Sequence, residues 1–320
     1  MSSLSAILNP FHEDLVKLED SLESVSEVHV DHLSELLGYS LGSSGKRIRP
    51  ALTLLSGKFY NYDLGYLLPM AAAVELLHTA TLVHDDVIDK SAVRRGRSTV
   101  NEAWGEDKAV LLGDYLFARA GEFCASTGNL RVIKLFSQTL ATMSIGELNQ
   151  ASSTFNLEQT REHYFERISK KTASMFVLAT ESGAILSQAL ERAVEILREY
   201  GLNLGIAFQI VDDTLDFIGT EEELGKPVGS DLAQGTLTLP TMLLLQYYPE
   251  DNPIKRFFED QGDLESKKRV VDLIRNSPIV QECYDIAANY CACQNLDLLP
   301  DNTSCQALID LADYVVRHEK

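Results

Sequence analysis

Proline is absent between Pro69 and Pro227, and this gap most strongly limits the folds open to the chain. Long stretches of the interval are rich in Ala, Leu, Glu and Ile, and their apolar residues recur about every 3.6 residues, as on one face of an α-helix. The segments 116–123 and 132–150 are examples. Because alternating strand patterns bounded by Asn-Gly or Asp-Gly turns are missing from the sequence, we expect an all-α protein. A chain of 320 residues can form one large helical domain.

Loops are expected where polar residues cluster with Gly or Pro. These places are Gly42–Pro50, Ala92–Asn101, Ser152–Asn156, Gly219–Thr238 and Pro249–Pro253. None of them is long enough or low enough in complexity to be an interdomain linker.

The chain is strongly acidic. It carries 28 Lys and Arg residues against 47 Asp and Glu residues, which gives a formal net charge of −19 and a pI near 4.7. A surface this acidic argues against nucleic acid as a partner, because nucleic-acid binding needs a basic face. It also disfavours strong docking to an anionic membrane and leaves only weak peripheral contact open.

The N-terminal residues 1–10 show no basic region and no long apolar core, so we expect no signal peptide. No run approaches 18 uninterrupted apolar residues, so no transmembrane segment is expected. The five cysteines are odd in number, and the pair Cys291 and Cys293 lacks the spacing of zinc ligands. These features predict a cytoplasmic protein.

The acidic pattern Asp-Asp-x-x-Asp occurs twice, each time after an apolar segment. Its carboxylates are Asp85, Asp86 and Asp89 in the first copy, and Asp212, Asp213 and Asp216 in the second. The first and last aspartates of each copy are four residues apart, so on a helix they lie on one side and repel each other.

One such copy alone is better explained as a solvated acidic helix end. Two copies, each in an apolar helix, indicate carboxylates that need cations. Oxygen ligands without His or Cys select Mg²⁺, which keeps some of its waters and bridges to substrate phosphates.

Polar residues continue each acidic pattern back along its helix. Thr81 and His78 precede Asp85 at helical spacing, and Gln209 and Gly205 precede Asp212. We therefore expect both stripes to face one cavity. For His78, a satisfied core histidine and a phosphate contact stay equally open.

Basic residues accompany both acidic patterns. They are Lys46 and Arg49 after a Gly/Ser-rich turn, Arg94 and Arg95 just after the first pattern, and Lys171 and Lys226 elsewhere. Arginine can bind phosphate oxygens in a bidentate manner, and lysine supplies a point charge. A single basic run is usually a solvated surface patch, but in a chain of net charge −19 these clusters indicate a diphosphate site.

Five motifs in this order resemble the trans-isoprenyl diphosphate synthases, over about residues 37–240. The motifs are Gly-Lys-Arg-Ile-Arg-Pro from Gly45, Leu-His-Thr-Ala-Thr-Leu-Val-His-Asp-Asp-Val-Ile-Asp from Leu77, Arg-Arg-Gly from Arg94, Lys-Thr-Ala from Lys171 and Phe-Gln-Ile-Val-Asp-Asp-Thr-Leu-Asp from Phe208. The resemblance implies a single polyprenyl synthetase-like domain over 1–320, folded as one helical bundle around a deep central cavity, and a homodimer.

The resemblance also implies a role for each matching residue. The isopentenyl diphosphate site would comprise Lys46, Arg49, His78 and Arg95. Contacts to the allylic diphosphate would come from Arg94, Lys171, Thr172, Gln209 and Lys226. The direct magnesium ligands would be Asp85, Asp89 and Asp212, supported by Asp86, Asp213 and Asp216. Three Mg²⁺ ions are expected with bound substrate, and the residues expected to carry the catalysis are Asp85, Asp89, Asp212, Lys171 and Gln209.

The reaction implied is the Mg²⁺-assisted ionisation of an allylic diphosphate, such as farnesyl diphosphate, followed by condensation with isopentenyl diphosphate. Ala80 and Thr81 are small where short-chain relatives carry bulky aromatics, which by resemblance predicts a long all-trans product. A deeper floor could come from Leu77, Val74 or Phe136, of which Phe136 is better explained as plain core. Thr236 stands where many relatives have a lysine, so we expect weaker binding of the allylic diphosphate.

Three alternatives remain open at this point. A geranylgeranyl diphosphate synthase would make a shorter product by the same chemistry. A class I terpene cyclase normally lacks the second Asp-Asp-x-x-Asp and does not need the site of Lys46, Arg49 and His78. A non-catalytic subunit of a heteromeric synthase would generally have lost one acidic pattern, and both are intact here.

Overall fold

The structure is a computed structural model that describes residues 3–42, 45–94, 96–225, 227–261, 263–292 and 295–317. The expectation of an all-α protein is confirmed. Its helices are α1 (Leu4–Leu8), α2 (His12–Ser24), α3 (Asp31–Leu41), α4 (Ile48–Gly57), α5 (Leu64–Ile88), α6 (Val100–Trp104), α7 (Glu106–Ser126), α8 (Leu130–Ser152), α9 (Arg161–Ile168), α10 (Ser174–Leu186), α11 (Glu191–Ile218), α12 (Glu221–Leu224), α13 (Ser230–Ala233), α14 (Leu239–Tyr247), α15 (Pro253–Glu259), α16 (Leu264–Arg275), α17 (Ile279–Ala292) and α18 (Thr303–Arg317). The 3₁₀ helices η1 (Asn9–Phe11) and η3 (Leu296–Leu298) and the π-helix η2 (Ser169–Ala173) complete the helical part.

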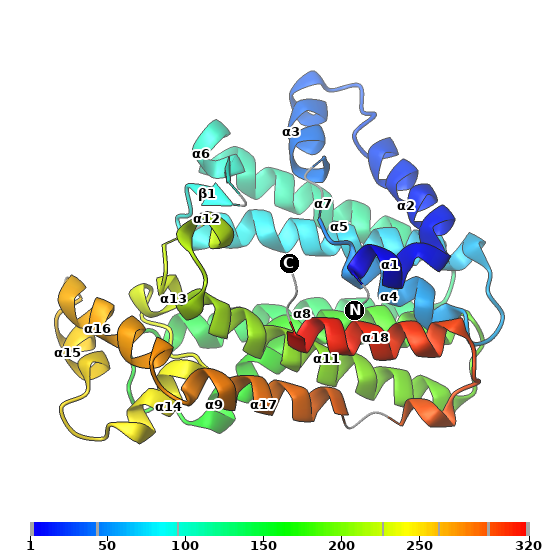
Figure 1. Cartoon of the computed structure of the whole chain (residues 1–320). Coiled ribbons are helices and arrows are strands. Elements are labelled where there is room, and N and C mark those ends of the chain that lie inside the picture. Colours follow the sequence, from blue (N-terminus) through cyan, green and yellow to red (C-terminus); the bar gives the residue numbers. More distant parts are fainter. Residues whose placement is uncertain are drawn as a thin grey trace.

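The long helices run in nearly the same direction across the molecule, and α15 and α16 lie at one end (Figure 1). Helix α5 packs against α7 and α4, and α10 packs between α4 and α11. Helix α17 covers another side of α11. The two helices that carry the acidic patterns, α5 and α11, therefore both lie within the bundle.

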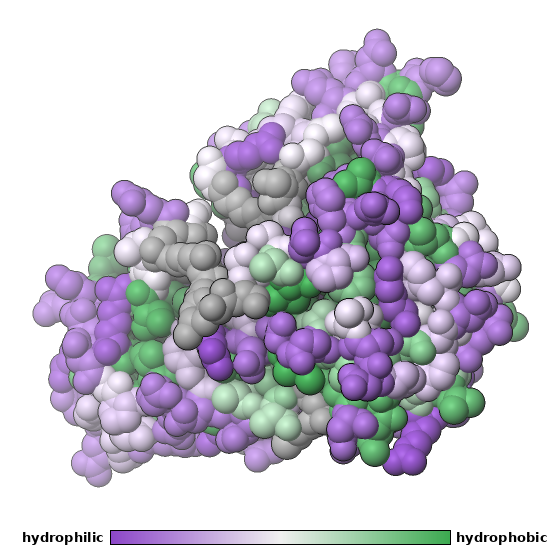
Figure 2. Space-filling model, turned by 45° about the vertical axis from the view of Figure 1, so that its right-hand side comes forward, coloured by the Kyte–Doolittle hydropathy of each residue, from purple (hydrophilic) through white to green (hydrophobic). Residues whose placement is uncertain are grey.

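Helix α5 is the one helix in the described part that is long and apolar enough to cross a membrane. However, 67% of its apolar window is buried inside the protein, and residues such as Leu76 and Leu77 are fully buried. On the face shown in Figure 2, hydrophilic residues predominate and hydrophobic ones form small separate patches. Helix α5 is thus explained as a core helix, and the described residues contain no clear membrane span.

Close helix packing brings α11 to η2. A Cβ atom at Gly205 would lie 2.5 Å from the Cα atom of Ala173, so only glycine allows this approach. The prediction that Gly205 shares the polar cavity stripe is wrong, because this residue faces Ala173 instead. Its role is to let α11 and η2 come together.

Most of the expected loops are confirmed, with local helix inside them. Helix α4 begins at Ile48, within the expected 42–50 loop, and α12 and α13 lie within 219–238. The 92–101 segment contains a short antiparallel hairpin of β1 (Val93–Arg94) and β2 (Arg97–Ser98). These two strands make up the sheet of the described residues.

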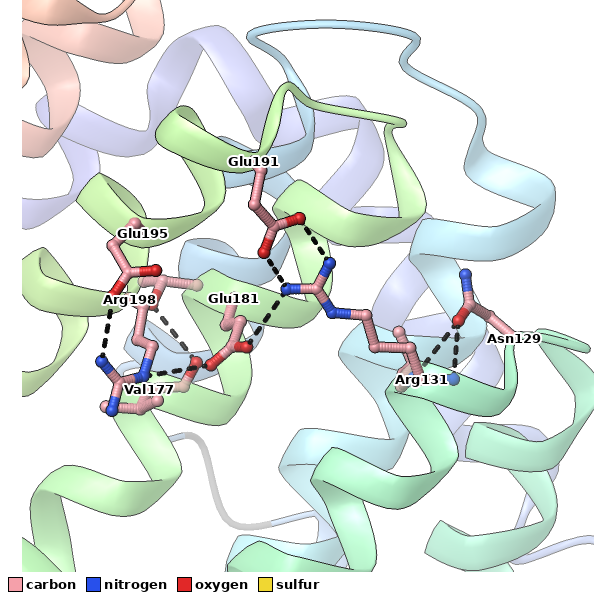
Figure 3. A network of polar contacts seen from close by, with 9 residues as sticks. Asn129, Arg131, Val177, Glu181, Glu191, Glu195 and Arg198 are labelled. Carbon is pink, nitrogen blue, oxygen red and sulfur yellow. Dashed lines mark hydrogen bonds and ion pairs between the residues drawn. The ribbon is translucent and has the colours of Figure 1, made fainter.

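An ion-pair network ties α8, α10 and α11 together (Figure 3). Both Nη atoms of Arg131 donate to the carboxylate of Glu191 at 2.7 Å. Glu181 lies between Arg131, at 3.9 Å, and Arg198, at 3.7 Å. We call this group the α11 N-terminal network, since Glu191 is the first residue of α11.

Candidate functional site

A cavity of about 550 Å³ brings the two acidic patterns together. Its acidic wall residues are Asp85, Asp89, Glu147, Asp212, Asp213 and Asp231. Its basic ones are Arg49, Arg94, Arg167 and Lys171, and the polar residues include His78, Thr81, Thr172, Gln209 and Thr236. These side chains come from α4, α5, α8, α9, η2, α11, β1 and α13, from the C-cap of α5 and from the segment that follows α13.

The first acidic pattern lies where α5 ends. Helix α5 ends at Ile88, and Asp89 is its C-cap residue. Asp85 and Asp89 line the cavity, whereas Asp86 is buried on another side of the helix, where its Oδ1 accepts a hydrogen bond of 2.8 Å from Arg94 Nε. Asp86 is thus placed to hold Arg94 at the cavity wall.

The second pattern divides in a similar way. Asp212 is exposed and Asp213 is buried, and both line the cavity. Asp216 does not line it: this side chain is 1% exposed and accepts hydrogen bonds from Ser230 Oγ and the Asp231 backbone N–H. Asp216 therefore fixes the start of α13. Its supporting role in metal binding stays a prediction.

The cavity disfavours negative charge on its own aspartates. Burial raises the pKa of Asp85 from its ordinary value of 3.8 to about 6, since the nearby Lys171 only partly offsets burial and the charge of Glu147. Burial also raises the pKa of Asp213 to about 7. The pKa values of Asp86 and Asp89 are raised too, again mainly by burial. Cations that enter the cavity would therefore be bound favourably.

Lys171 projects from the π-helix η2, a local irregularity that often marks functional positions. Its ammonium group pairs with Glu147 and lies 3.4 Å from Gln150 Oε1. Burial alone would lower the pKa of Lys171, but Asp85 and Glu147 beside it raise that pKa, so the side chain carries its charge.

The predicted contacts from Thr172 and Gln209 lie together on the cavity wall. Thr172 Oγ1 donates to Gln209 Oε1 at 2.6 Å, and Gln209 Nε2 donates to Asp213 Oδ1 at 2.7 Å. The two residues thus join η2 to the second acidic pattern.

Of the basic residues expected to bind isopentenyl diphosphate, the structure places Arg49 and His78 in the cavity, 3.1 Å apart between Nη1 and Nε2. Lys46 is exposed and does not line this cavity; its ammonium group lies 5.4 Å from the ring centre of Tyr314 in α18. Arg95 and Lys226, also expected at the site, lie outside the described residues.

The residues expected to set product length fall into two groups. Thr81 lines the cavity, but Leu77 and Ala80 are fully buried and are not part of its lining, nor is Phe136. The apolar part of the lining comes from other residues, namely Leu82, Ile88, Phe117, Leu140, Met143, Ile168, Met175 and Phe208. The proposed role of Leu77 and Ala80 therefore stays a prediction.

Several residues that line the cavity were not predicted from the sequence. Glu147 and Gln150 continue the helical stripe of Met143 on α8, a periodicity that could have indicated them. Asp231 lies in the segment before Thr236, and both face the cavity. Nothing in the sequence pattern indicated Arg167, which approaches from α9.

The donor set fits Mg²⁺ without forming a closed cage. Within the described ranges, no group of three or more His, Cys, Asp or Glu residues is close enough to hold a metal ion alone. Magnesium usually binds one or two carboxylates and completes its coordination with waters and substrate phosphates. Asp85, Asp89 and Asp212 offer such carboxylates around one cavity.

Comparison with known proteins identifies the family of this chain. The polyprenyl synthetase family model matches residues 30–274. Heptaprenyl diphosphate synthase component 2 of Geobacillus stearothermophilus is 37% identical, and the match covers 99% of each chain. The chloroplastic solanesyl-diphosphate synthase 2 of Oryza sativa subsp. japonica is 37% identical over 98% of this chain and 79% of the relative.

Among solved structures, the polyprenyl synthase of Caulobacter crescentus, complexed with calcium and isoprenyl diphosphate, has a TM-score of 0.93 at 33% identity, and the match covers 98% of both chains. Similarity in sequence and in fold thus extends over almost the whole chain. The chain therefore belongs to the polyprenyl synthetase family, the prenyltransferases that synthesise polyprenyl diphosphates.

Proposed function

We propose that the chain condenses isopentenyl diphosphate with an allylic diphosphate, such as farnesyl diphosphate, to give a long-chain all-trans polyprenyl diphosphate. The observation that carries this proposal is the composition of one cavity, in which aspartates of both acidic patterns share the walls with Arg49, Arg94 and Lys171 and with apolar side chains. The heptaprenyl and solanesyl activities named for the two relatives support a long product.

The charged wall residues would assist departure of the allylic diphosphate. As the allylic C–O bond breaks, its electron pair leaves with the diphosphate, whose growing charge is stabilised by Arg94 and Lys171. Gln209 and Thr172 would orient the same group. Magnesium, when bound by Asp85, Asp89 and Asp212, would neutralise the diphosphate as a Lewis acid. We propose three ions, as in the sequence-based expectation.

The second substrate would be held by Arg49 and His78, with Lys46 and Arg95 completing its diphosphate site. The double bond of isopentenyl diphosphate then attacks the allylic carbocation, a C–C bond forms, and a proton is lost. The departing diphosphate is the base proposed for that proton. Because no nucleophilic side chain is required, charge stabilisation and orientation are the main catalytic contributions of the protein.

Product length tests the finer part of this proposal. Ala80 has no exposed surface and neighbours Thr81 in the cavity wall, so an aromatic ring at Ala80 must displace its surroundings. We expect Ala80→Tyr to shorten the product. An unchanged product distribution would contradict the proposed role of Ala80, and Thr81→Phe would then test the residue that already lines the cavity.

We also propose that residues 1–320 form one domain, that two copies form a homodimer, and that the protein acts in the cytoplasm with at most weak peripheral membrane contact. Exposed apolar residues on α7 and α8 support an association surface: Val110, Leu111, Ile145 and Leu148 are 41%, 66%, 48% and 68% exposed. Light scattering of the purified protein tests the dimer, and Leu111→Glu with Leu148→Glu should yield monomers.

A single assay tests the reaction. Purified protein is incubated with farnesyl diphosphate, labelled isopentenyl diphosphate and Mg²⁺, and the products are separated by chain length. Longer prenyl diphosphates are expected, and products that stop at geranylgeranyl diphosphate would contradict a long chain. A hydrocarbon product would indicate a cyclase, and no turnover would indicate a non-catalytic subunit.

A further inference from the structure

One buried side chain contacts the second acidic pattern and has no part in the proposed chemistry. Tyr164 of α9 has no exposed surface, and its hydroxyl donates a hydrogen bond of 2.7 Å to Asp213 Oδ2. Burial and the neighbouring Asp213 raise the pKa of this phenol well above its ordinary value. The hydroxyl therefore keeps its proton and can act only as a hydrogen-bond donor toward the carboxylate.

The other oxygen of Asp213 is also engaged. Its Oδ1 accepts from Gln209 Nε2 at 2.7 Å, and Gln209 Oε1 in turn accepts from Thr172 Oγ1 at 2.6 Å. Two hydrogen bonds to two oxygens fix the plane of the Asp213 carboxylate. The carboxylate in turn fixes which end of the Gln209 amide faces Thr172, so the order Tyr164, Asp213, Gln209, Thr172 forms one chain of hydrogen bonds.

Tyr164 itself is held firmly. The Arg167 guanidinium lies 5.5 Å from the centre of the Tyr164 ring. Arg167 is 7% exposed and donates from Nη2 to the Leu237 carbonyl at 2.6 Å and from Nη1 to Gln159 Oε1 at 3.1 Å. Phe165 packs edge-on against the ring. The anchor of the hydrogen-bond chain is thus a rigid part of the protein, while the other three members line the cavity.

We propose that Tyr164 is a positioning residue: its hydroxyl fixes Asp213 and, through it, Gln209 and Thr172 in the orientation that receives the allylic diphosphate and its metal ions. This inference rests on the proposed function for the identity of the ligand. It does not make Tyr164 a catalytic residue, because the phenol is buried behind Asp213 and does not line the cavity.

The variant Tyr164→Phe tests this role, since it removes one oxygen and keeps the packed ring. We expect kcat/KM for the allylic diphosphate to fall about ten- to a hundredfold, the range for loss of one hydrogen bond to a charged group. The KM for isopentenyl diphosphate should not change, because Arg49 and His78, which are proposed to hold that substrate, lie on α4 and α5 and not on α9, η2 or α11.

Two matched controls separate positioning from stability. Tyr200 is 1% exposed and donates to the Leu308 carbonyl at 2.9 Å, so Tyr200→Phe removes an equally buried hydrogen bond away from the cavity. Tyr62 donates to Asp14 Oδ2 at 2.6 Å, so Tyr62→Phe removes a phenol–carboxylate bond elsewhere. Both controls should keep wild-type kinetics even if they lower the melting temperature.

A binding measurement completes the test without turnover. Inorganic diphosphate with Mg²⁺ should raise the melting temperature of the wild type and of both controls, and should raise that of Tyr164→Phe clearly less. Wild-type kinetics with a wild-type shift in Tyr164→Phe, or an equal loss of activity in Tyr200→Phe, would overturn the inference. A wild type that shows this shift but transfers no prenyl group would contradict the proposed function and leave the binding comparison valid.

If Tyr164→Phe does not fold, the buried carboxylate left with one partner fewer is the expected cause. The double variant Tyr164→Phe/Asp213→Asn removes that charge and is compared with Asp213→Asn alone. Since Tyr164 is proposed to act through Asp213, the two should have the same kinetics and the same diphosphate shift. A further loss in the double variant would overturn the inference.

Discussion

Helix α11 carries acidic residues at both of its ends, in opposite situations. At its N-terminus, Glu191 is stabilised by the positive end of the helix dipole and by two hydrogen bonds from Arg131. About 30 Å away along the helix, toward its C-terminal end, Asp212 and Asp213 line the cavity, where burial disfavours the charge of Asp213. Asp85 and Asp89 likewise line the cavity from the C-terminal end of helix α5.

The pKa values show the same contrast. The hydrogen bond from Arg131 lowers the pKa of Glu191, whereas burial raises the pKa of Asp213 to about 7 and that of Asp85 to about 6. The protein thus neutralises its acidic residues at one end of α11 with its own arginines. At the other end it leaves carboxylates that external cations must neutralise, which is the electrostatic basis of a metal and diphosphate site.

The largest effect is expected when cavity carboxylates are neutralised. Asp85→Asn or Asp212→Asn should lower kcat by about 10³-fold, equivalent to about 4 kcal/mol, because a magnesium ligand is lost. The melting temperature of Asp85→Asn without Mg²⁺ should stay the same or rise, since burial disfavours the charge that this variant removes. Steady-state kinetics and thermal melts check both parts, and a loss of stability without Mg²⁺ would contradict the electrostatic comparison.

A smaller loss of activity is expected at the cavity lysine. Lys171→Met should lower kcat by about 10²-fold, the effect typical of removing one donor to a developing anion. The neighbouring Lys170 pairs with Glu166 and does not line the cavity, so Lys170→Met is the matched control and should keep full activity. Equal losses of kcat in the two variants would show that the position of Lys171 at the cavity does not distinguish it from Lys170.

Stability should depend on pH in the direction set by the raised pKa values. Between pH 4 and pH 7, folded Asp85 and Asp213 bind protons more tightly than the unfolded chain does, with pKa values of about 6 and 7 against 3.8. The free energy of unfolding without Mg²⁺ should therefore fall as the pH rises through this range.

Mg²⁺ with inorganic diphosphate should reduce this fall, because both bind the folded protein with its carboxylates ionised. Melting temperatures at pH 5 and pH 7.5 check the sign. Asp85→Asn should flatten the pH dependence, and an unchanged slope in that variant would assign the effect to the general net charge instead.

The smallest effect is expected in the α11 N-terminal network. The side chains of Arg131 and Glu191 are 47% and 69% exposed, so their ion pair is screened by solvent. Glu191→Gln should lower the free energy of unfolding only slightly and should leave kcat and KM unchanged. Urea denaturation measures the free energy of unfolding, and the prenyl-transfer assay measures kcat and KM. A large loss of activity would contradict the proposed difference between the two ends of α11.

The sequence alone predicted helices, the two acidic patterns and the helix faces on which their members lie. Helical periodicity separates Asp85 from Asp86, since adjacent residues on a helix do not face each other. It could not indicate that Asp86 holds Arg94, or that Asp216 fixes the start of α13 rather than lining the cavity. Those partners come from segments that fold back from elsewhere in the chain.

The order of motifs, and with it the family and its chemistry, was determined by the sequence, because each motif is local and its residue types select phosphate and magnesium. Only the tertiary structure decided which residues share the cavity. The close approach of Gly205 to Ala173 brings α11 to η2, so that Gln209 meets Thr172, and the packing of α9 buries Tyr164 behind Asp213. Such contacts join residues 37 and 49 positions apart, and packing between helices, not local sequence, sets them.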